Sequence, residues 1–213
     1  LFLTAAHLVV GLNDNNTVVK SSVVYINNPL TQQWISVDMN DVYYDGTADI
    51  ALIRTRIDLR YYPWVLRLAT VEAKIGDYVT VHGNPAGIDN LSVSAGIVRD
   101  NHFAQSGGAQ TSDSIFVSSP GINGNSGSPI IDIEGNIVGI FTFGLTFQET
   151  LGGGSNLNTL QQVLPILAGF PASCRNTLKK YLGFKYYIAT PFEMTQYYPG
   201  FPVDNYGAVV YEV

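Results

Sequence analysis

Ser126 is the residue in this chain whose surroundings most directly suggest chemistry. It lies within Gly121-Ile122-Asn123-Gly124-Asn125-Ser126-Gly127-Ser128-Pro129, a stretch with three glycines and two asparagines. Glycine and asparagine tolerate the positive φ angles of tight turns, and the apolar residues 130–133 that follow predict a strand. A serine on such a turn has two interpretations. It is either an ordinary turn residue, or a nucleophile that the glycine-rich backbone leaves exposed because the neighbouring residues have no side chains to cover it. The rest of the sequence must distinguish these two interpretations.

A nucleophilic serine needs a base, a carboxylate that orients the base, and donors for the developing oxyanion. His7 ends Leu3-Thr4-Ala5-Ala6-His7, where an apolar strand gives way to small residues that allow close backbone packing. Asp49 stands directly before the apolar run 50–53. A carboxylate at such a buried edge is costly unless it is paired, and His7 would supply the partner.

The other histidines and acids are weaker candidates. His102 falls in a polar stretch and is expected to be solvated, and His82 at a strand end is expected to be structural. Four other aspartates of the first part of the chain lie in more polar surroundings and are weaker candidates: Asp38, Asp41, Asp45 and Asp58.

Three segments taken together resemble the trypsin/chymotrypsin-like serine protease family. They are Thr-Ala-Ala-His at 4–7, Asp-Ile-Ala-Leu-Ile at 49–53 and Gly-Asn-Ser-Gly-Ser-Pro at 124–129, and they follow that family's chain order of His, Asp and Ser. The α/β-hydrolase alternative fails, because its Gly-x-Ser-x-Gly turn would have Ser128 in the last position and because no histidine follows Ser126.

Further segments are similar to the HtrA (Deg) branch of that family. They are Val-His-Gly-Asn-Pro-Ala-Gly at 81–87, Ser-Val-Ser-Ala-Gly-Ile-Val at 92–98 and the asparagine before the candidate serine, Asn125. Tyr181-Leu182-Gly183-Phe184 resembles the carboxylate-binding loop of a PDZ domain, and residues 207–213 look like a PDZ strand. The chain departs from the branch at Ser128, where glycine is usual, and by lacking a proline between Asn123 and Gly124.

The resemblance implies a role for each site residue. Ser126 would be the nucleophile, His7 the general base and then acid, and Asp49 the group that fixes the tautomer of His7. The backbone N–H groups of Gly124 and Ser126 would form the oxyanion hole. Thr142-Phe143-Gly144 would pair with the substrate backbone, and Tyr181-Leu182-Gly183-Phe184 would capture a peptide carboxylate. Neither a cofactor nor a metal is expected. The lack of an acid near Pro120-Gly121 argues against cleavage after Lys or Arg. We therefore expect the specificity pocket to accept small or medium apolar side chains.

The elements that must position these residues are mostly strands. Hydrophobic residues make up 46% of the 213 residues and charged residues only 13%, which is enough apolar material for a large core. Short strand-like segments recur up to about residue 147 between Gly, Pro, Asn and Asp clusters, as in a sandwich or barrel. They are expected at 1–4, 17–26, 34–39, 50–54, 78–82, 91–98, 114–118, 129–133 and 137–143.

The expected fold class is therefore all-β. The resemblance to the chymotrypsin-like proteases implies two antiparallel six-stranded-type β-barrels, the first lacking its N-terminal strands. Gly152-Gly153-Gly154 reads as a flexible loop, without the Gly-Lys-Ser/Thr ending of a phosphate-binding loop. Leucines at three- and four-residue spacing then predict a helix over 157–168. The expected domains are a protease domain at 1–170, a linker at 171–180 and a partial PDZ-like domain at 181–213.

Charge and composition restrict the partners. A net charge of −6 argues against a nucleic-acid partner, no apolar run is long enough to span a membrane, and the single Cys174 excludes an intrachain disulfide. Polypeptide substrates, C-terminal peptides and a homotrimer are the partners that the HtrA resemblance implies, and it also favours an extracytoplasmic or organellar compartment.

The chain starts within a strand-like run, so preceding residues, including any targeting segment, are expected to be missing. Two rivals remain open: a silent protease fold used as a binding or structural module, and a PDZ-based peptide-binding scaffold.

Overall fold

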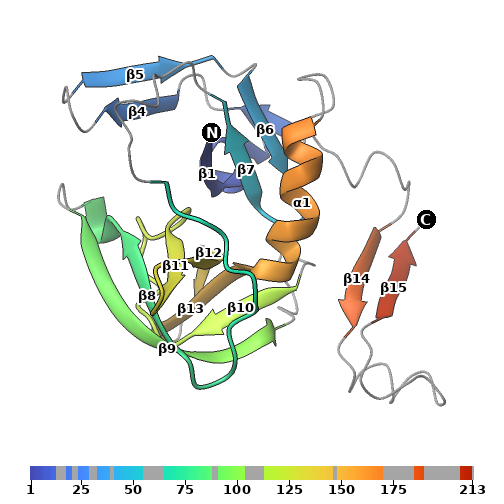
Figure 1. Cartoon of the computed structure of the whole chain (residues 1–213). Coiled ribbons are helices and arrows are strands. Elements are labelled where there is room, and N and C mark those ends of the chain that lie inside the picture. The colour runs from blue at the N-terminus through green and yellow to red at the C-terminus, as the bar shows by residue number, and fades with distance from the viewer. Residues whose placement is uncertain are drawn as a thin grey trace.

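The C-terminal half of the described chain forms a closed barrel of six antiparallel strands in the order β10-β13-β12-β11-β8-β9 (Figure 1). The computed structural model describes residues 1–12, 18–20, 24–28, 33–38, 41–54, 65–87, 91–103, 113–145, 148–169, 185–189 and 207–212. The barrel strands are β8 (Tyr78–Gly83), β9 (Ser92–Phe103), β10 (Ser114–Val117), β11 (Pro129–Asp132), β12 (Ile137–Leu145) and β13 (Gln148–Asn156). The all-β expectation is confirmed.

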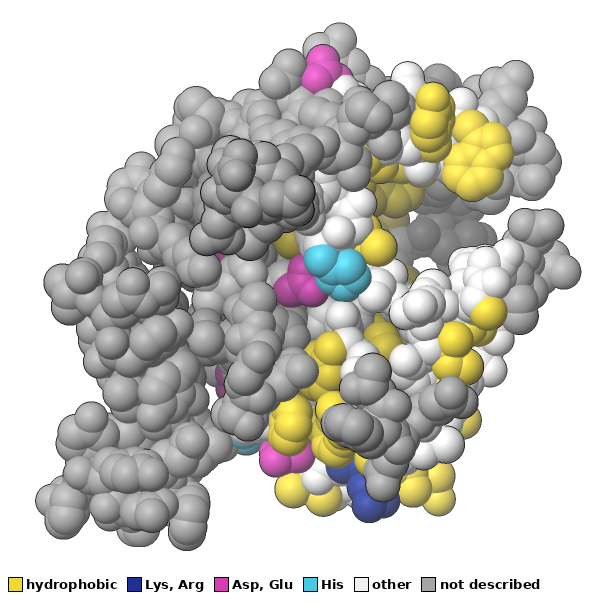
Figure 2. Space-filling view, turned by 180° about the vertical axis from the view of Figure 1, so that it is seen from behind, with side chains coloured by type: hydrophobic (Ala, Val, Ile, Leu, Met, Phe, Trp, Pro, Cys, Tyr) yellow, Lys and Arg dark blue, Asp and Glu magenta, His cyan; other side chains and the backbone are white. Residues whose placement is uncertain are grey.

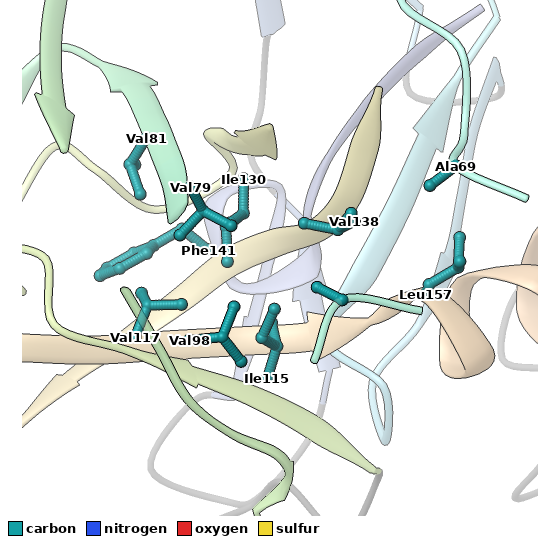
Figure 3. Close-up of a cluster of buried hydrophobic side chains, with 11 residues drawn as sticks. Ala69, Val79, Val81, Val98, Ile115, Val117, Ile130, Val138, Phe141 and Leu157 are labelled. Carbon is teal, nitrogen blue, oxygen red and sulfur yellow. The ribbon is translucent and has the colours of Figure 1, made fainter. Parts of the chain in front are cut away.

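The barrel is filled by β-branched and aromatic side chains (Figure 3). Alternation along β8 shows how the sequence achieves this, because Val79 and Val81 are buried whereas Thr80 and His82 face outward. The fully buried members of the cluster include Val98, Ile115, Val117, Ile130 and Phe141.

The N-terminal half is built from three smaller sheets. One has the order β1-β7-β6, and the other two are the pairs β2-β3 and β4-β5. The bounds are β1 (Phe2–Ala5), β2 (Val10–Leu12), β3 (Val18–Lys20), β4 (Val24–Asn28), β5 (Gln33–Val37), β6 (Val42–Asp45) and β7 (Ile50–Ile53). Among the described residues these sheets do not close into the expected second barrel. They nevertheless share one apolar core, to which Val9, Val37, Val42, Ala51 and Ile53 contribute.

The three-stranded sheet is buried on both faces, which explains the continuous apolar run of β7. Ala51 and Ile53 face the N-terminal core, whereas Ile50 and Leu52 face a second cluster. The helix α1 (Leu157–Gly169) contributes Leu160, Val163 and Leu167 to that second cluster, and β12 contributes Ile137 and Ile140. The expected helix is confirmed, and it packs the two halves of the domain together.

Two expectations about individual segments were wrong, and two strands of the N-terminal half were missed. Gly152-Gly153-Gly154 is not a loop but a buried part of β13, where the backbone lies against neighbouring strands too closely for side chains. The single strand expected over 17–26 is instead β3 and β4, which belong to different sheets. The strands β2 and β6 were not anticipated.

Near the C-terminus, β14 (Lys185–Ala189) and β15 (Gly207–Glu212) form an antiparallel pair. The linker expected at 171–180, with Cys174, and the PDZ-like loop Tyr181-Leu182-Gly183-Phe184 lie outside the described residues. Within the described part of the chain, no helix is long and apolar enough to cross a membrane.

Candidate active site

His7 is presented by a short 3₁₀ turn, Ala6–Leu8, that follows directly on β1. Ala5 and Ala6 are 0% and 1% exposed, so only the smallest side chains fit where β1 turns against the neighbouring backbone. The His7 side chain itself is 43% exposed. The strand thus ends in a buried support from which the imidazole of His7 faces solvent.

Asp49 contacts His7 through both carboxylate oxygens. Oδ2 lies 2.6 Å from the ring Nδ1 of His7, and Oδ1 accepts the backbone N–H of the same residue at 2.8 Å. The main-chain carbonyl of Asp49 also accepts the N–H of Ala6 at 3.0 Å. The space-filling view shows an acidic side chain lying directly against a solvent-exposed histidine on this face (Figure 2).

This contact defines the tautomer and the basicity of His7. A carboxylate only accepts hydrogen bonds, so Nδ1 carries the proton and the lone pair of Nε2 is available as a base. The hydrogen bond to Asp49, with a smaller contribution from its charge, raises the pKa of His7 above its ordinary value, and burial partly opposes that rise. The arrangement is that of a general base held in one orientation.

Asp49 adopts a positive φ of 53°, and the turn before it is organised by Asp45. Asp45 is 1% exposed, and its Oδ1 accepts the backbone N–H groups of Thr47 at 2.8 Å and Ala48 at 2.9 Å. Asp45 was expected in polar surroundings, and its burial shows that this expectation was wrong. The turn itself could have been predicted, because Asp45-Gly46-Thr47 is a recognisable turn signal. Ser155 of β13 adds a hydrogen bond from its hydroxyl to the carbonyl of Ala48, which joins the turn to the barrel.

Ser126 lies on a loop that contacts both β12 and the His7 segment. The N–H of Gly127 donates to the carbonyl of Phe141 at 2.7 Å, and the N–H of Phe141 donates to the carbonyl of Ser128 at 2.8 Å. Gly127 has a φ of +81°, and a methyl group there would lie 3.1 Å from both the Ala5 nitrogen and a Leu8 methyl. The residue after Ser126 therefore packs against residues on both sides of His7.

The candidate oxyanion loop rests on the segment 83–87. The N–H of Ala86 donates to the carbonyl of Asn123 at 2.6 Å, and a methyl group at Gly124 would lie 3.1 Å from the nitrogen of Ala86. Gly124 has a φ of +101°, and the N–H of Asn125 closes the turn onto the carbonyl of Ile122 at 3.1 Å. Gly-Asn-Pro-Ala-Gly at 83–87 thus forms the support for the loop that carries Gly124.

The residues expected to bind substrate backbone, Thr142-Phe143-Gly144, lie on β12 beside this loop. Thr142 is buried, Phe143 is half-buried and Gly144 is exposed. Phe143 stacks on Phe103 with ring centroids 6.1 Å apart. The edge of β12 that Gly144 occupies is therefore the part of this segment most open to solvent.

His82 and His102 lie away from Asp49. His82 shares a 2.9 Å hydrogen bond with Thr80 on the outside of β8, as a structural residue would. His102 was expected in a solvated loop, but it belongs to β9 and contacts Asp113 at 2.8 Å and Glu72 at 3.7 Å. Among the described residues, no group of three or more His, Cys, Asp or Glu side chains could hold a metal ion.

Comparison with known families agrees with this geometry. A family model described as "Trypsin-like peptidase domain" matches residues 1–140. The chain belongs to the trypsin-like peptidase family. The expected likeness to the HtrA branch is also confirmed: the chain is 30% identical over 221 residues to "Serine protease HTRA1A" of Danio rerio and 29% identical over 217 residues to "Serine protease HTR4" of Rattus norvegicus.

These alignments cover 100% and 95% of the present chain but 43% of each relative. Solved structures share the fold. "HtrA-type protease AlgW with tripeptide" superposes with a TM-score of 0.63 at 18% identity, covering 99% of this chain and 64% of that one. The active form of the Rv3671c protease from M. tuberculosis gives 0.61 at 23% identity, covering 79% and 69%.

Proposed function

We propose that this chain is the catalytic part of a serine endopeptidase that uses Ser126, His7 and Asp49. The observation that carries the proposal is the contact of Asp49 with both the ring and the backbone N–H of His7, next to a Gly127 packed against Ala5 and Leu8. Membership of the trypsin-like peptidase family supports the same assignment.

In this mechanism Ser126 Oγ attacks the carbonyl carbon of a peptide bond while His7 Nε2 takes the hydroxyl proton. Asp49 stabilises the imidazolium that forms and keeps its Nδ1–H in place. The tetrahedral oxyanion accepts hydrogen bonds from the backbone N–H groups of Gly124 and Ser126. His7 then gives its proton to the leaving amine, and water hydrolyses the acyl-enzyme on Ser126 by the reverse sequence of proton transfers.

The substrate backbone pairs as an extended strand with Thr142-Phe143-Gly144. Strand addition suits this segment because β12 is held on its other side by β13, from Phe143↔Gly153 and Gly144↔Gly152, and because Gly144 is exposed. Since the HtrA relatives extend well beyond this chain, the polypeptide substrate is proposed without a specific identity.

A fluorophosphonate probe tests the proposal, because it labels only a serine that is activated as a nucleophile. We expect the wild-type chain to be labelled at Ser126, and Ser126→Ala and His7→Ala to lose labelling. Ser36→Ala is the matched control, since Ser36 is an exposed serine on β5, and it should be labelled as the wild type is. Labelling that persists in Ser126→Ala, or none in the folded wild type, would contradict the proposal and favour a non-catalytic module.

Two further partners are proposed from the HtrA likeness. Tyr181-Leu182-Gly183-Phe184 would bind the carboxylate of a C-terminal peptide, and the chain would assemble as a homotrimer. Peptide affinity measured by fluorescence anisotropy should survive Ser126→Ala and fall in Gly183→Asp. Analytical ultracentrifugation of the chain tests the trimer directly.

A further inference from the structure

The loop that carries Ser126 touches β12 at its far end through two glycines. A methyl group on Gly144 would lie 2.6 Å from the Cα and 2.7 Å from the carbonyl carbon of Gly121. A methyl group on Gly121 would meet the Cα of Gly144 and would lie 2.7 Å from the carbonyl oxygen of Leu151. The two backbones are therefore in direct van der Waals contact, and glycine at both positions is what allows it.

This contact is the second of two places at which the loop that carries Ser126 meets β12. The loop is hydrogen-bonded to β12 at Gly127 and Phe141, and it meets β12 again at Gly121 and Gly144. The side chain of the residue whose carbonyl Ser126 attacks must lie within a few ångströms of Ser126. We expect that side chain to enter the region between the loop and β12, because both of these segments adjoin Ser126.

The two walls of this region are held in position. On the loop side, Asn125 is buried, and its side-chain NH₂ donates to the carbonyl of Pro120 at 2.9 Å. On the strand side, the rings of Phe141 and Phe143 lie against Gly152 and Gly153, with ring carbons 3.0 and 3.1 Å from methyl groups placed there. Each wall is therefore supported by contacts of its own.

The dimensions decide which side chains fit. Carbon atoms pack at about 3.5–4.0 Å, so a flat ring lying between two backbones needs them about 7 Å apart. Gly121 and Gly144 leave no such separation. We propose that the subsite for the residue before the cleaved bond accepts only glycine or alanine, because the Gly121–Gly144 contact closes the slot that a longer side chain would occupy.

The inference rests on the proposed function and narrows the small or medium apolar preference expected from the sequence. Peptidyl aryl phosphonates that differ only in the residue bearing the phosphonate test it, because their inactivation rates measure access to Ser126 without requiring turnover. We expect the alanine reagent to react about 100-fold or more faster than the valine and phenylalanine reagents. Equal rates for alanine and phenylalanine would overturn the inference.

A small fluorophosphonate separates failure of the inference from failure of the proposed function. If it labels Ser126 while alanine and phenylalanine reagents react equally, the inference alone fails. If it labels nothing, the proposed function fails and the inference fails with it.

Gly144→Ala tests the contact itself. Its new methyl group meets backbone atoms of Gly121, so the walls must shift and the alanine-to-phenylalanine rate ratio should change at least tenfold. Gly169→Ala adds the same methyl group where nothing lies within 4 Å, and it should leave the ratio unchanged. An unchanged ratio in a folded Gly144→Ala variant would also overturn the inference.

Discussion

Asp49 holds His7 by its ring and by its backbone at once. One carboxylate oxygen lies 2.6 Å from Nδ1, and the other accepts the main-chain N–H at 2.8 Å. The contact with Nδ1 restrains rotation of the imidazole about its side-chain bonds, and the contact with the main-chain N–H fixes the turn that carries it. The orientation of the candidate base is therefore set before any substrate binds.

Replacing Asp49 by asparagine should leave the fold intact but disable the base. An amide can donate a hydrogen bond to Nδ1, so it permits the tautomer in which Nε2 carries the proton and cannot accept one. We expect kcat/KM for peptide hydrolysis to fall about 10⁴-fold. Glu134→Gln, on an exposed turn residue, is the matched control and should keep wild-type activity. A loss below tenfold in Asp49→Asn would remove Asp49 from its proposed role.

The rate of hydrolysis should fall in acid because His7 must be neutral to act as a base. Its hydrogen bond to Asp49 raises the pKa of His7, so the midpoint of kcat/KM against pH should lie above the ordinary value of about 6.5. Below that midpoint kcat/KM should drop about tenfold per pH unit. The residual activity of Asp49→Asn should show a lower midpoint. Identical midpoints in the two proteins would mean that another group controls the profile.

How much of this site the sequence predicted depends on the kind of contact involved. His7, Asp49 and Ser126 each lie in a short sequence motif. Those motifs, in the chain order His, Asp and Ser, were enough to select the three residues. The supporting contacts are of two kinds. Asp45 accepts N–H groups two and three residues further along the chain, within a turn signal that the sequence displays, whereas Ser155 donates to a carbonyl 107 residues away. No local pattern shows which backbone group the buried hydroxyl of Ser155 will meet.

The strands were predicted where apolar residues recur and missed where they do not. Three consecutive glycines have a low preference for strands, yet residues 152–154 pair with both β10 and β12 in the barrel. Their conformation is imposed by close neighbouring backbones, which is tertiary information. His102 was misjudged for the same reason, since its partners Asp113 and Glu72 lie 11 and 30 residues away in the sequence.

Asp45→Asn should weaken both stability and catalysis. The substitution removes a buried charge that accepts the N–H groups of Thr47 and Ala48, and hydrogen bonds to charged groups contribute about 1.5–3 kcal/mol. We expect the free energy of unfolding in urea to fall by about that amount and kcat to fall because the turn before Asp49 loosens. Asp77→Asn is a useful control, since Asp77 accepts the backbone N–H of Lys74 in an exposed turn far along the chain. Unchanged stability in Asp45→Asn would contradict the assigned role.

His102 should make stability depend on pH. The hydrogen bond to Asp113 raises the pKa of His102, burial opposes the rise, and the charges of Asp113, Glu72 and Asp100 add to it. Because the folded pKa is the higher one, the protonation-linked stabilisation is fully present below about pH 6.5 and is lost as the pH rises through the folded pKa. The difference in free energy of unfolding between wild type and His102→Gln should therefore shrink as the pH rises above about 6.5. A pH-independent difference would exclude this coupling.

Gly154→Ala should destabilise the barrel. A methyl group there would lie 2.7 Å from the nitrogen of Thr142 and 2.8 Å from the carbonyl carbon of Ile140, and these backbone atoms cannot rotate away. Overpacking of this kind costs about 1–3 kcal/mol, which exceeds the gain of about 0.4–1 kcal/mol from restricting the unfolded chain. Gly169→Ala gives the same restriction at the open end of α1, so its free energy of unfolding should stay level or rise. Equal unfolding curves for the two variants would show that the packing at residue 154, where β13 lies between β10 and β12, leaves room for a methyl group.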